Sequence, residues 1–582
     1  MSDVVIGPIT PMHRRQLLSR AALLPLLPLA ACQGRPELPP GDWAGQDWQQ
    51  GHALRQRLAQ GLPITPDVQR RTQVLIAGAG IAGLAAARAL RLAGVADVRL
   101  LELQTQAGGN SRASQLGGLP CPLGAHYLPL PGEAATEVQD LLEEFGLRQR
   151  VAGRWRYDER HLCHSPQERL YLHGQWQEGL LPMADVGAAT LAQYRRFAQQ
   201  VQALSQAAPF AMPALTQWAR RSKTQKNSGI ASVHLELDAI TFDEWLGRQG
   251  LDDGYLRWYL DYCCRDDYGA GLARVSAWAG IHYFASRHGF ALPGDDQAPA
   301  QEREGLLTWP EGNAWLAQRL AAPLQAGGQL LTGRGVLQIA EGRHGVQLDA
   351  LDMASGRIER WQAQRCIVAL PLFMAARVLA AGAPDFVAQA AQRLPSAPWL
   401  VTNLHLQRPL ADSPGAAPAW DNVLHDDPAL GALGYVDAGH QRLAGGALLA
   451  GPKVLTYYQA LGDLPGAREQ LQQLPWTHWA SAIIASLARA HPDLPQQVTQ
   501  VELMRYGHAM AMPQPGLQAF LSQIGQLPTS GHGKALSNGE RPRPLPTPRS
   551  ARLLFAHSDW SGYSVFEEAF TRGHAAGLAA LG

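Results

Sequence analysis

Hydrophobic and polar positions change period abruptly in the first fifth of this chain, where a strand pattern gives way to a helix pattern. Residues 73–77 (QVLIA) are a short apolar run of the kind that forms a buried strand. The glycine-rich run Gly78-Ala79-Gly80-Ile81-Ala82-Gly83 follows, and apolar residues then recur with helical spacing to about Leu92, before Gly94. The pattern predicts a strand, a glycine turn and a helix that ends at Gly94.

The spacing of these glycines has a chemical meaning in that position. Gly78 permits a tight turn, Gly80 lets a pyrophosphate approach the backbone, and Gly83 lets the helix pack closely on the strand, so the helix N-terminus can hold phosphate charge. A second apolar run, 98–101, ends in Glu102, nineteen residues after Gly83, where a carboxylate can bind ribose hydroxyls. We therefore expect a dinucleotide site here, the alternative being a glycine-rich turn that binds nothing.

Shorter patterns further along the chain predict a mixture of strands and helices. We expect a hairpin at 168–177, helices at 188–204, 242–260 and 276–286, a polar loop at 219–234, strands at 335–339 and 366–370, and a meander over 345–361. In the helix over 276–286, Trp278 and His282 fall on one face. Core packing is the first interpretation of that face, and the wall of a substrate pocket is the alternative.

Composition limits the class of protein. With 582 residues and 46% hydrophobic content, the chain is long enough for two or more domains with their own cores. The net charge is +1 and no block of basic residues stands out, which argues against a nucleic-acid partner. Lysine occurs only at positions 223, 226, 453 and 534.

The N-terminal sequence has the pattern of a targeting signal rather than of a folded domain. Arg14-Arg15 precedes an apolar run, 21–31, which is too short to span a bilayer and contains Pro25 and Pro28. The arginine pair resembles a twin-arginine signal, the alternative being the basic start of an ordinary secretion signal. Leu29-Ala30-Ala31-Cys32 resembles the lipobox of bacterial lipoproteins.

From these features we expect residues 1–31 to be a signal peptide and Cys32 to carry a lipid anchor. Residues 32–71, which are rich in Pro, Gln and Arg, would then be a tether with one helix. The protein would be exported and held at the periplasmic side of a membrane.

The remaining cysteines give no support for a redox dithiol or a metal site. They are Cys121, Cys163, Cys263, Cys264 and Cys366, an odd number without a CxxC spacing. In the sequence His161-Leu162-Cys163-His164, neighbouring side chains on an extended segment would point to opposite faces, so we expect no metal there. Whether any of these cysteines form disulfides stays open.

Several stretches together resemble the flavin-containing amine oxidase superfamily, which includes monoamine and polyamine oxidases and relatives similar to phytoene desaturases. They are the glycine turn with Ala87, Glu102, Gly108-Gly109, Gly124-Ala125-His126-Tyr127, residues 553–563 (LLFAHSDWSGY) and the segment 567–576. The resemblance implies an α/β fold with a Rossmann-like FAD-binding domain, a β-meander and an inserted α+β substrate domain. It also places a family helix over 306–324.

The family pattern implies a discontinuous FAD-binding domain at 72–150, 305–395 and 550–582. The substrate domain would take 151–304 and 396–549, with a flexible Pro/Gly/Ser-rich loop at 523–549. The residues implied to bind FAD are Gly78, Gly80, Ile81, Ala82, Gly83, Glu102, Gly109, Asn110, Arg112, Gly124, Ala125, His126, Tyr127, Val336, Asp559, Val565 and Phe566.

The chain departs from the family pattern near the reacting part of the flavin. The strand 399–406 lacks the lysine that holds a water in monoamine oxidases, so Asn403 or Thr402 would have to hold it. No cysteine lies in 505–513, where His508 takes the place of the attachment residue, so we expect FAD to be bound non-covalently, a histidyl link being the alternative.

The paired-aromatic cage of the family is half present. Tyr563 fits one wall, while Ala509 occupies the place of the other. Tyr563, Asn403 and His508 are therefore the catalytic candidates.

Three functions are compatible with these residues. The first is oxidation of a C–N bond in a small organic substrate by hydride transfer to flavin, with oxygen or an unknown partner as electron acceptor. The second is desaturation or isomerisation of an apolar substrate. The third is a flavin-binding lipoprotein without turnover. The neighbours His557, Ser558 and Asp559 cannot orient towards one another as a hydrolase triad must, and an NAD-dependent enzyme leaves Gly108-Gly109 and Asp559 without a role.

Overall fold

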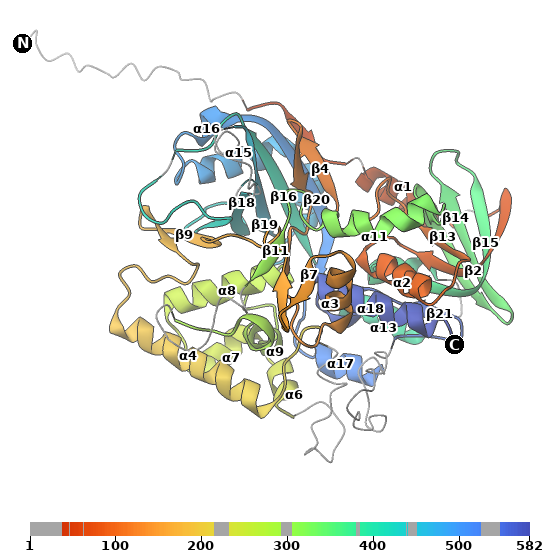
Figure 1. The fold of residues 1–582 in the computed structure, drawn as a ribbon, viewed down its shortest axis with the longest axis horizontal. Helices are drawn as coiled ribbons and strands as arrows, with labels where there is room; N and C mark the ends of the chain where they lie inside the picture. The colour runs from red at the N-terminus through yellow and green to blue at the C-terminus, as the bar shows by residue number, and fades with distance from the viewer. Residues whose placement is uncertain are drawn as a thin grey trace, which may run out of the picture. The chain divides into compact units, whose positions relative to one another are not determined.

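A parallel sheet built from distant parts of the chain organises the structure, a computed structural model (Figure 1). The structure describes residues 38–582 except 46, 62, 215–231, 293–304, 380–383, 412, 438, 440–450 and 525–546. This seven-stranded sheet has the order β12–β3–β2–β15–β14–β13, with β21 beside β15. Its strands are β2 (Val68–Ala77), β3 (Val98–Leu101), β12 (Leu330–Leu331), β13 (Arg334–Gly342), β14 (Gly345–Asp352), β15 (Ile358–Val368) and β21 (Leu553–Phe555).

The strand, turn and meander predictions for this sheet are confirmed. β12, β3, β2, β15 and β21 run parallel, while β13, β14 and β15 form an antiparallel meander. The strands come from the three segments that the sequence assigns to a cofactor domain, although the domain boundaries themselves stay a prediction. The α/β fold class is confirmed.

Both faces of the parallel sheet are covered, as continuous apolar strands require. Val74 and Ile76 of β2 belong to one core, whereas Leu75 and Ala77 belong to another, because successive side chains of a strand point to opposite faces. The first core contains residues of α2 (Ile81–Leu92), α11 (Ala314–Ala326) and α18 (Phe566–Ala579), and the second contains residues of α12 (Leu372–Val378) and α13 (Asp385–Arg393).

Small residues bring α2 and α18 close together. A methyl group at Gly573 would overlap the carbonyl oxygen of Ala82, and one at Gly577 would lie 2.6 Å from the carbonyl oxygen of Ala86. The two helices therefore run side by side in the same direction, with the first turn of α2 beside the middle of α18.

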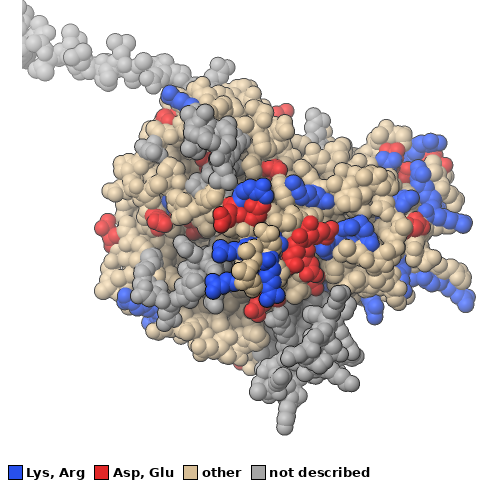
Figure 2. Space-filling view, in the orientation of Figure 1, with Lys and Arg blue, Asp and Glu red and all other residues tan. Residues whose placement is uncertain are grey.

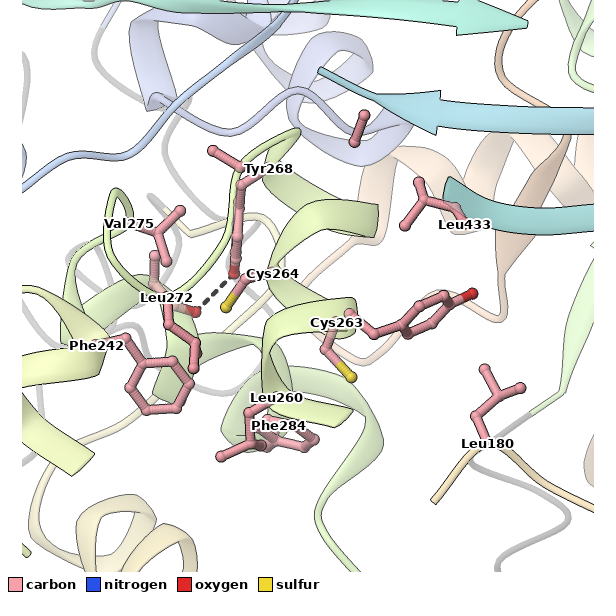
Figure 3. Packing of buried hydrophobic residues seen from close by; sticks show 14 of the residues in the cluster. Leu180, Phe242, Leu260, Cys263, Cys264, Tyr268, Leu272, Val275, Phe284 and Leu433 are labelled. Atoms are coloured by element: carbon pink, nitrogen blue, oxygen red, sulfur yellow. Dashed lines mark hydrogen bonds between the residues drawn. The ribbon is translucent and has the colours of Figure 1, made fainter. Parts of the chain in front are cut away.

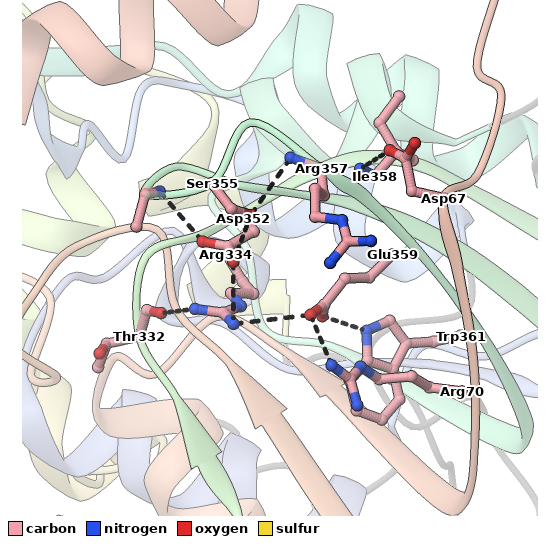
Figure 4. Close-up of polar contacts among 11 residues, drawn as sticks. Asp67, Arg70, Thr332, Arg334, Asp352, Ser355, Arg357, Ile358, Glu359 and Trp361 are labelled. Carbon is pink, nitrogen blue, oxygen red and sulfur yellow. Dashed lines mark hydrogen bonds and ion pairs between the residues drawn. The ribbon is translucent and has the colours of Figure 1, made fainter.

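Ion pairs fix the base of the meander (Figure 4). Arg334 lies 3.3 Å from Asp352 and 3.6 Å from Glu359, and Glu359 also pairs with Arg70 at 3.1 Å. Glu359 is 3% exposed, so its charge needs these partners. The network holds β13, the strand that carries Val336, in register with its neighbours.

A second, eight-stranded sheet has the order β1–β20–β16–β19–β18–β17–β9–β10. Its strands are β1 (Gly41–Trp43), β9 (Glu168–Leu172), β10 (Gln175–Glu178), β16 (Ser396–Leu406), β17 (Asp421–Leu424), β18 (Ala432–Asp437), β19 (Lys453–Ala460) and β20 (Val498–Ala511). β9 and β10 form the predicted hairpin.

Helices that pack beside this sheet include α4 (Ala188–Ala207), α6 (Ser232–Asp238), α7 (Phe242–Arg248), α8 (Gly254–Tyr268) and α9 (Ala277–Tyr283), which continues into η1 (Phe284–His288). Figure 3 shows Cys263 and Cys264 of α8 among apolar side chains of this core. Trp278 and His282 stack on each other at 4.6 Å and are buried, which agrees with core packing.

Shorter elements connect these layers. They are α1 (Asp47–Ala59), β4 (Ala113–Leu116), β5 (Leu119–Pro122), β6 (Tyr127–Pro129), α3 (Thr136–Glu144), β7 (Arg148–Val151), β8 (Arg154–Tyr157), β11 (Leu306–Thr308), α14 (Ala467–Gln473), α15 (Trp476–Leu487), α16 (Leu494–Gln497), α17 (Leu517–Gln523) and η3 (Ser558–Ser561).

Three element predictions need correction. The helix predicted over 242–260 is two helices, because Gly250 has a positive φ of 62° and the Asp253 side chain caps α8. The helix over 306–324 is a strand, β11, followed by α11, with a turn at Gly312. Of the loop at 219–234, the last three residues lie in α6 and the rest lies outside the described residues.

The predicted tether is in part built into the fold. β1 pairs in parallel with Val501–Leu503 of β20. Leu54 of α1 is buried against Leu337 and Ile358, and β2 already begins at Val68. Residues 1–31, for which a signal peptide is predicted, Cys32 and most of the predicted loop at 523–549 lie outside the described residues.

The five cysteines within the described part of the chain are free and buried, so none of them forms a disulfide. In the same part of the chain no group of His, Cys, Asp or Glu has the arrangement of a metal site. Nor does any helix there have the length and apolar character to cross a membrane.

Candidate active site

The glycine turn between β2 and α2 has the geometry that the sequence predicts. Gly78 has a φ of +98°, and a methyl group there would lie 2.5 Å from the carbonyl oxygen of Ala369. A methyl group at Gly83 would overlap the carbonyl oxygen of Gly78. At Gly80, by contrast, the nearest atom is the Cα of Gly109 at 4.0 Å, so this backbone is open to a ligand.

Glu102 holds the glycine turn as well as ending β3. Its Oε2 accepts a hydrogen bond from the Ala79 amide at 2.8 Å, and its Oε1 accepts one from the Gln104 amide at 2.9 Å. Burial raises the pKa of this carboxyl, while these amides and Arg112 act in the opposite direction. The sequence predicts the position of Glu102 but not this contact with the turn.

The loop after β3 closes over the turn. Arg112 Nε donates to the carbonyl oxygen of Gly109 at 3.0 Å, and Asn110 Nδ2 donates to the carbonyl oxygen of Ala509 at 2.8 Å. The Ala125 amide donates to the carbonyl oxygen of Asn110 at 2.9 Å. The glycine turn, Asn110 and the 124–127 stretch are therefore neighbours, although they are spread over fifty residues of sequence.

Asp559 joins the ends of β21 and α12. Its Oδ2 accepts a hydrogen bond from the Leu372 amide at 2.9 Å, and its Oδ1 lies 3.2 Å from Nδ1 of His557. Burial alone would raise the pKa of Asp559, but His557 and the Leu372 amide hold the pKa below its usual value. A carboxylate at the carboxyl end of a parallel strand is thus kept ionised.

A cavity of about 140 Å³ lies between these segments and the second sheet. Seven of the residues that the sequence assigns to the cofactor line it: Asn110, Gly124, Ala125, His126, Tyr127, Val565 and Phe566. The rest of the lining is Pro129, Asp266, Asp267, Arg287, Asn313, Trp399, Val401, Tyr458, Tyr506, Ala509, Met510, Ser564 and Glu567. Val565 is the residue before α18, so the N-terminus of that helix faces the cavity.

Aromatic rings form one wall of the cavity. His126 stacks on Tyr458 with ring centroids 4.3 Å apart, and burial lowers the pKa of His126 to about 3, so its ring is neutral. The hydroxyl of Tyr458 donates to the carbonyl oxygen of Gly124 at 3.1 Å, and that of Tyr506 donates to the carbonyl oxygen of Leu123 at 2.8 Å. Both tyrosines therefore hold the glycine of the 124–127 stretch in place.

Charged groups form another part of the lining. Arg287 pairs with Glu567 at 2.7 Å, and Asp267 accepts a hydrogen bond from Tyr563 at 2.6 Å. Asp266 accepts one from the Tyr127 hydroxyl at 3.4 Å. The lining thus holds three carboxyl groups and one arginine.

The structure does not bring the three catalytic candidates together in this cavity. Tyr563 is fully buried and its hydroxyl is bonded to Asp267. Asn403 is buried, its Nδ2 donates to the carbonyl oxygen of Pro122 at 3.0 Å and its Oδ1 accepts from Thr456 at 2.7 Å, so both ends of the amide have protein partners. None of Tyr563, Asn403 and His508 lines the cavity, so their catalytic roles stay predictions that the geometry does not favour.

A strand irregularity explains the position of His508. Ala397 of β16 pairs with Met510 of β20, but Trp399 pairs with Tyr506, so β20 contains two extra residues between these pairs. His508 lies in this bulge, exposed, with its ring stacked on Phe373 at 4.2 Å. The same bulge places the Tyr506 ring at the cavity.

Sequence reasoning missed much of the cavity lining, above all Trp399, Tyr458, Tyr506, Asp266, Asp267, Arg287 and Glu567. A signal for some of them was available. Alternation along 399–406 puts Trp399 and Val401 on one face, and Asp266 and Asp267 are adjacent acids at the end of a helix pattern rich in aromatic residues. The pairing partner of each strand could not be read from the chain.

Comparison with known proteins supports a common fold. The family model described as flavin containing amine oxidoreductase matches residues 81–576. A putrescine oxidase structure with bound putrescine aligns with a TM-score of 0.59 and 17% identity, over 88% of this chain and 99% of that one. Cyclohexylamine oxidase from Brevibacterium oxydans IH-35A aligns with a TM-score of 0.59 and 17% identity, over 88% and 98% of the two chains.

A protein with different chemistry shares the fold. The fatty acid isomerase of P. acnes that produces CLA aligns with a TM-score of 0.55 and 15% identity, over 88% of this chain and 98% of that one. At these identities the structural likeness establishes the fold alone, so the reaction has to be argued from the cavity.

Proposed function

The chain belongs to the flavin containing amine oxidoreductases, and from that premise we propose that it is an FAD-dependent enzyme that oxidises the C–N bond of an organic amine. In such a reaction the flavin supplies the redox chemistry, and the protein positions and charges the substrate. The acceptor of the electrons would be oxygen or another small molecule.

The described residues fit an extended dinucleotide. The open backbone at Gly80 and the N-terminus of α2 suit a pyrophosphate, and Glu102 lies beside them at the end of β3. Val336 lies on β13, while the N-terminus of α18 faces the cavity about Val565. FAD has a nucleotide, which suits the glycine turn and Glu102, and a flavin ring, which suits the N-terminus of α18 at the cavity. The two regions together therefore support FAD.

Non-covalent attachment has support from the lining. No cysteine is among the residues that line the cavity, and His508 lies in the exposed bulge of β20 outside it. We therefore propose that acid denaturation releases all of the yellow cofactor into the supernatant, and yellow colour that stays with the precipitate would contradict this proposal.

The charge of the cavity is the observation that carries the choice of substrate. The charged residues of the lining are three acids, Asp266, Asp267 and Glu567, and one base, Arg287. Acidic groups are therefore in excess over basic ones. An uncharged substrate would leave this excess buried without a counter-charge, which is costly. A protonated amine would supply the counter-charge, and the aromatic rings of the lining favour a cation as well.

The fatty acid isomerase among the structural neighbours defines the main alternative, an enzyme of apolar or carboxylate substrates. A carboxylate would need a cation in the cavity, but Arg287 is already paired with Glu567 at 2.7 Å. The third possibility is a flavin-binding protein without turnover.

An anaerobic reduction experiment tests the proposal. The protein reconstituted with FAD is mixed with a panel of primary amines, diamines and unsaturated fatty acids, and the visible flavin bands are recorded. We expect amines to bleach these bands and fatty acids to leave them unchanged. Bleaching by no amine would contradict the proposed reaction, and isomerisation of a fatty acid would favour the alternative.

We further propose that the enzyme is exported and anchored through Cys32. The support is the arginine pair, the apolar run and the lipobox-like Leu29-Ala30-Ala31-Cys32.

A further inference from the structure

Asp266 differs from the other charged groups of the cavity in its partners. Arg287 lies between Glu567, its ion-pair partner, and Asp267, whose carboxylate it also stabilises electrostatically. Asp267 receives the Tyr563 hydroxyl in addition. Asp266 receives only the Tyr127 hydroxyl at 3.4 Å, and among the described residues no basic side chain forms an ion pair with it.

Further carboxylates surround Asp266 instead of a cation. Asp267 on the same helix and Glu168 on β9 both act on it electrostatically, and Asp421 on β17 is influenced by Asp266 in turn. Arg265 and the Tyr127 hydroxyl act in the opposite direction, but more weakly. Three elements, α8, β9 and β17, therefore concentrate carboxyl groups around Asp266.

A second observation, on Glu567, indicates that a ligand with hydrogen-bond donors binds in this cavity. Glu567 is 2% exposed and lines the cavity, yet its Oε2 has no hydrogen-bond partner within the described part of the chain. A buried carboxylate oxygen without a donor costs free energy, about 1–3 kcal/mol or more for a charged group. A ligand that carries N–H donors and positive charge would satisfy this oxygen and Asp266 together.

The neighbouring rings suit the same ligand. Tyr127, whose hydroxyl meets Asp266, packs edge-on against Trp420 with ring centroids 5.7 Å apart, and His126 stacks on Tyr458. Aromatic faces attract cations when water is excluded. The acidic end of the cavity is thus also an aromatic one.

From these contacts we propose that Asp266 is a catalytic residue that binds the ammonium group of the substrate and accepts its proton. This inference rests on the proposed function. In the step, one N–H bond of the ammonium breaks, its electron pair stays on nitrogen, and the proton forms an O–H bond with the Asp266 carboxylate. The neutral amine that results has the lone pair that oxidation of a C–N bond requires.

The protonation behaviour of Asp266 agrees with this role. Burial, followed by the charges of Asp267 and Glu168, raises the pKa of Asp266 to about 7. A group with such a pKa can both accept and release a proton near neutral pH, which is the property of an effective general base.

A cation without an N–H group can bind to Asp266 but cannot transfer a proton to it. Such a ligand therefore measures cation binding separately from proton transfer. The probe is benzyltrimethylammonium, titrated into the protein loaded with FAD and followed by calorimetry between pH 5 and pH 9. Because only the ionised carboxylate attracts the cation, we expect the affinity to rise about tenfold per pH unit below pH 7 and to level off above it.

Three variants test whether Asp266 causes this pH dependence. Asp266→Asn should weaken binding at pH 8 at least tenfold and abolish the pH dependence, and Asp266→Glu should restore it in part. Tyr127→Phe removes a hydrogen bond that lowers the pKa of Asp266, so it should move the midpoint to higher pH. The control is Glu244→Gln, which changes an exposed carboxylate of α7. An unchanged pH dependence in Asp266→Asn would overturn the proposal.

Flavin reduction by a primary amine tests the proton transfer. In Asp266→Asn we expect the second-order rate constant at pH 7 to fall by about 10²–10⁴, the usual contribution of a positioned base. Its pH profile should lose the limb near pH 7, and Asp266→Glu should recover that limb.

The two proposals can fail separately. If amines reduce the flavin and the pH profile of Asp266→Asn matches that of the unchanged protein, the role of Asp266 is refuted while the proposed function stands. If no amine reduces the flavin although binding of benzyltrimethylammonium depends on Asp266, the proposed function and the proton transfer are refuted, and cation binding by Asp266 stands.

Discussion

Gly80 and Gly83 lie three residues apart in one turn, but a methyl group would meet different obstacles at the two positions. At Gly83 it would overlap the carbonyl oxygen of Gly78 within the protein itself. At Gly80 the nearest protein atom is 4.0 Å away, and the φ of −68° suits any residue. One glycine is needed by the fold, and the other is needed by the ligand that the turn is proposed to bind.

We therefore expect Gly83→Ala and Gly80→Ala to separate folding from cofactor binding. Gly83→Ala should lower the free energy of unfolding by about 1–3 kcal/mol, the usual cost of overpacking. Gly80→Ala should keep its melting temperature without cofactor but bind FAD at least tenfold more weakly. Thermal unfolding and fluorescence titration with FAD measure the two effects, and equal stability losses in both variants would contradict this distinction.

Asp266 should also affect stability in a pH-dependent way. Its pKa is raised from 3.8 to about 7, so the folded protein binds this proton more tightly than the unfolded chain does. Stability is therefore lost as the pH rises through this range, and the loss is complete above pH 7. One pKa unit corresponds to about 1.4 kcal/mol.

Asp266→Asn should consequently stabilise the protein by about 1–3 kcal/mol at pH 8 and by much less at pH 4, because the charge that it removes is present only at the higher pH. Urea denaturation at the two pH values measures the difference. Glu244→Gln, an exposed change on α7, should show no such dependence. A gain that is equal at both pH values would mean that the side-chain charge is not its source.

At this scale the sequence predicts residues of one local strand–turn–helix unit better than residues that strand pairing brings together. Gly78, Gly83 and Glu102 lie where the pattern places them, because a strand, a turn and a helix are local in sequence. Tyr506, which lines the cavity, pairs with Trp399 because the bulge in β20 moves the register by two residues. Such a bulge depends on the partner strand and leaves no local pattern.

Among the elements, β1 and α1 are the ones that the sequence describes least well. β1 has the sequence GDW, which shows neither strand alternation nor an apolar run, and it exists because Val501–Leu503 offers it a sheet edge. α1 is polar overall, and only a few of its side chains, Leu54 foremost, reach the core. Long-range pairing, rather than local propensity, decides such segments.

The contribution of α1 to the free energy of unfolding can be tested at Leu54. Leu54 is 3% exposed and touches Gly335, beside the strand position proposed to contact the nucleotide. Leu54→Ala should lower the free energy of unfolding by about 2–5 kcal/mol, as for other buried leucines. The matched control on the same helix is Gln56→Ala, an exposed position, which should change it by less than about 0.5 kcal/mol. Equal effects of the two changes would show that α1 does not pack in solution.

Whole-molecule organisation lies beyond what one sequence reveals. The first sheet takes strands from 68–101, 330–368 and 553–555, and the cavity takes residues from the second sheet, from α8 and α18, and from the segment 110–129. The family resemblance supplies the order of the segments for the first sheet. The acidic character of the cavity follows only when Asp266 and Glu567, three hundred residues apart, are brought together.

Charge is distributed differently outside and inside. In the view of Figure 2, basic and acidic side chains are interspersed over much of the described surface, while basic ones gather at the end where β13, β14 and β15 lie in Figure 1. The cavity, by contrast, has an excess of carboxyl groups. A net charge of +1 for the whole chain therefore does not describe the cavity, where three carboxyl groups lie with one arginine.

The proposed anchor can be tested on the full chain. Cys32→Ser removes the thiol that would carry the lipid, so we expect the protein to move from the membrane fraction to the soluble periplasmic fraction. Cell fractionation with detection of the protein measures this, and replacement of Arg14 and Arg15 by lysine should instead keep it inside the cell. Retention of Cys32→Ser on the membrane would contradict lipidation.

Because β1 pairs with β20, the segment between such a lipid anchor and the folded protein would be short. Gly41 is fixed in the sheet and is the ninth residue after Cys32 in the sequence. Nine residues span at most about 30 Å, which is close to the diameter of a small domain. A lipidated molecule would consequently stay within one molecular diameter of the bilayer surface, and its edge at β1 would face the lipid. Amines that gather at an anionic membrane would then meet this enzyme before those that remain in the bulk periplasm.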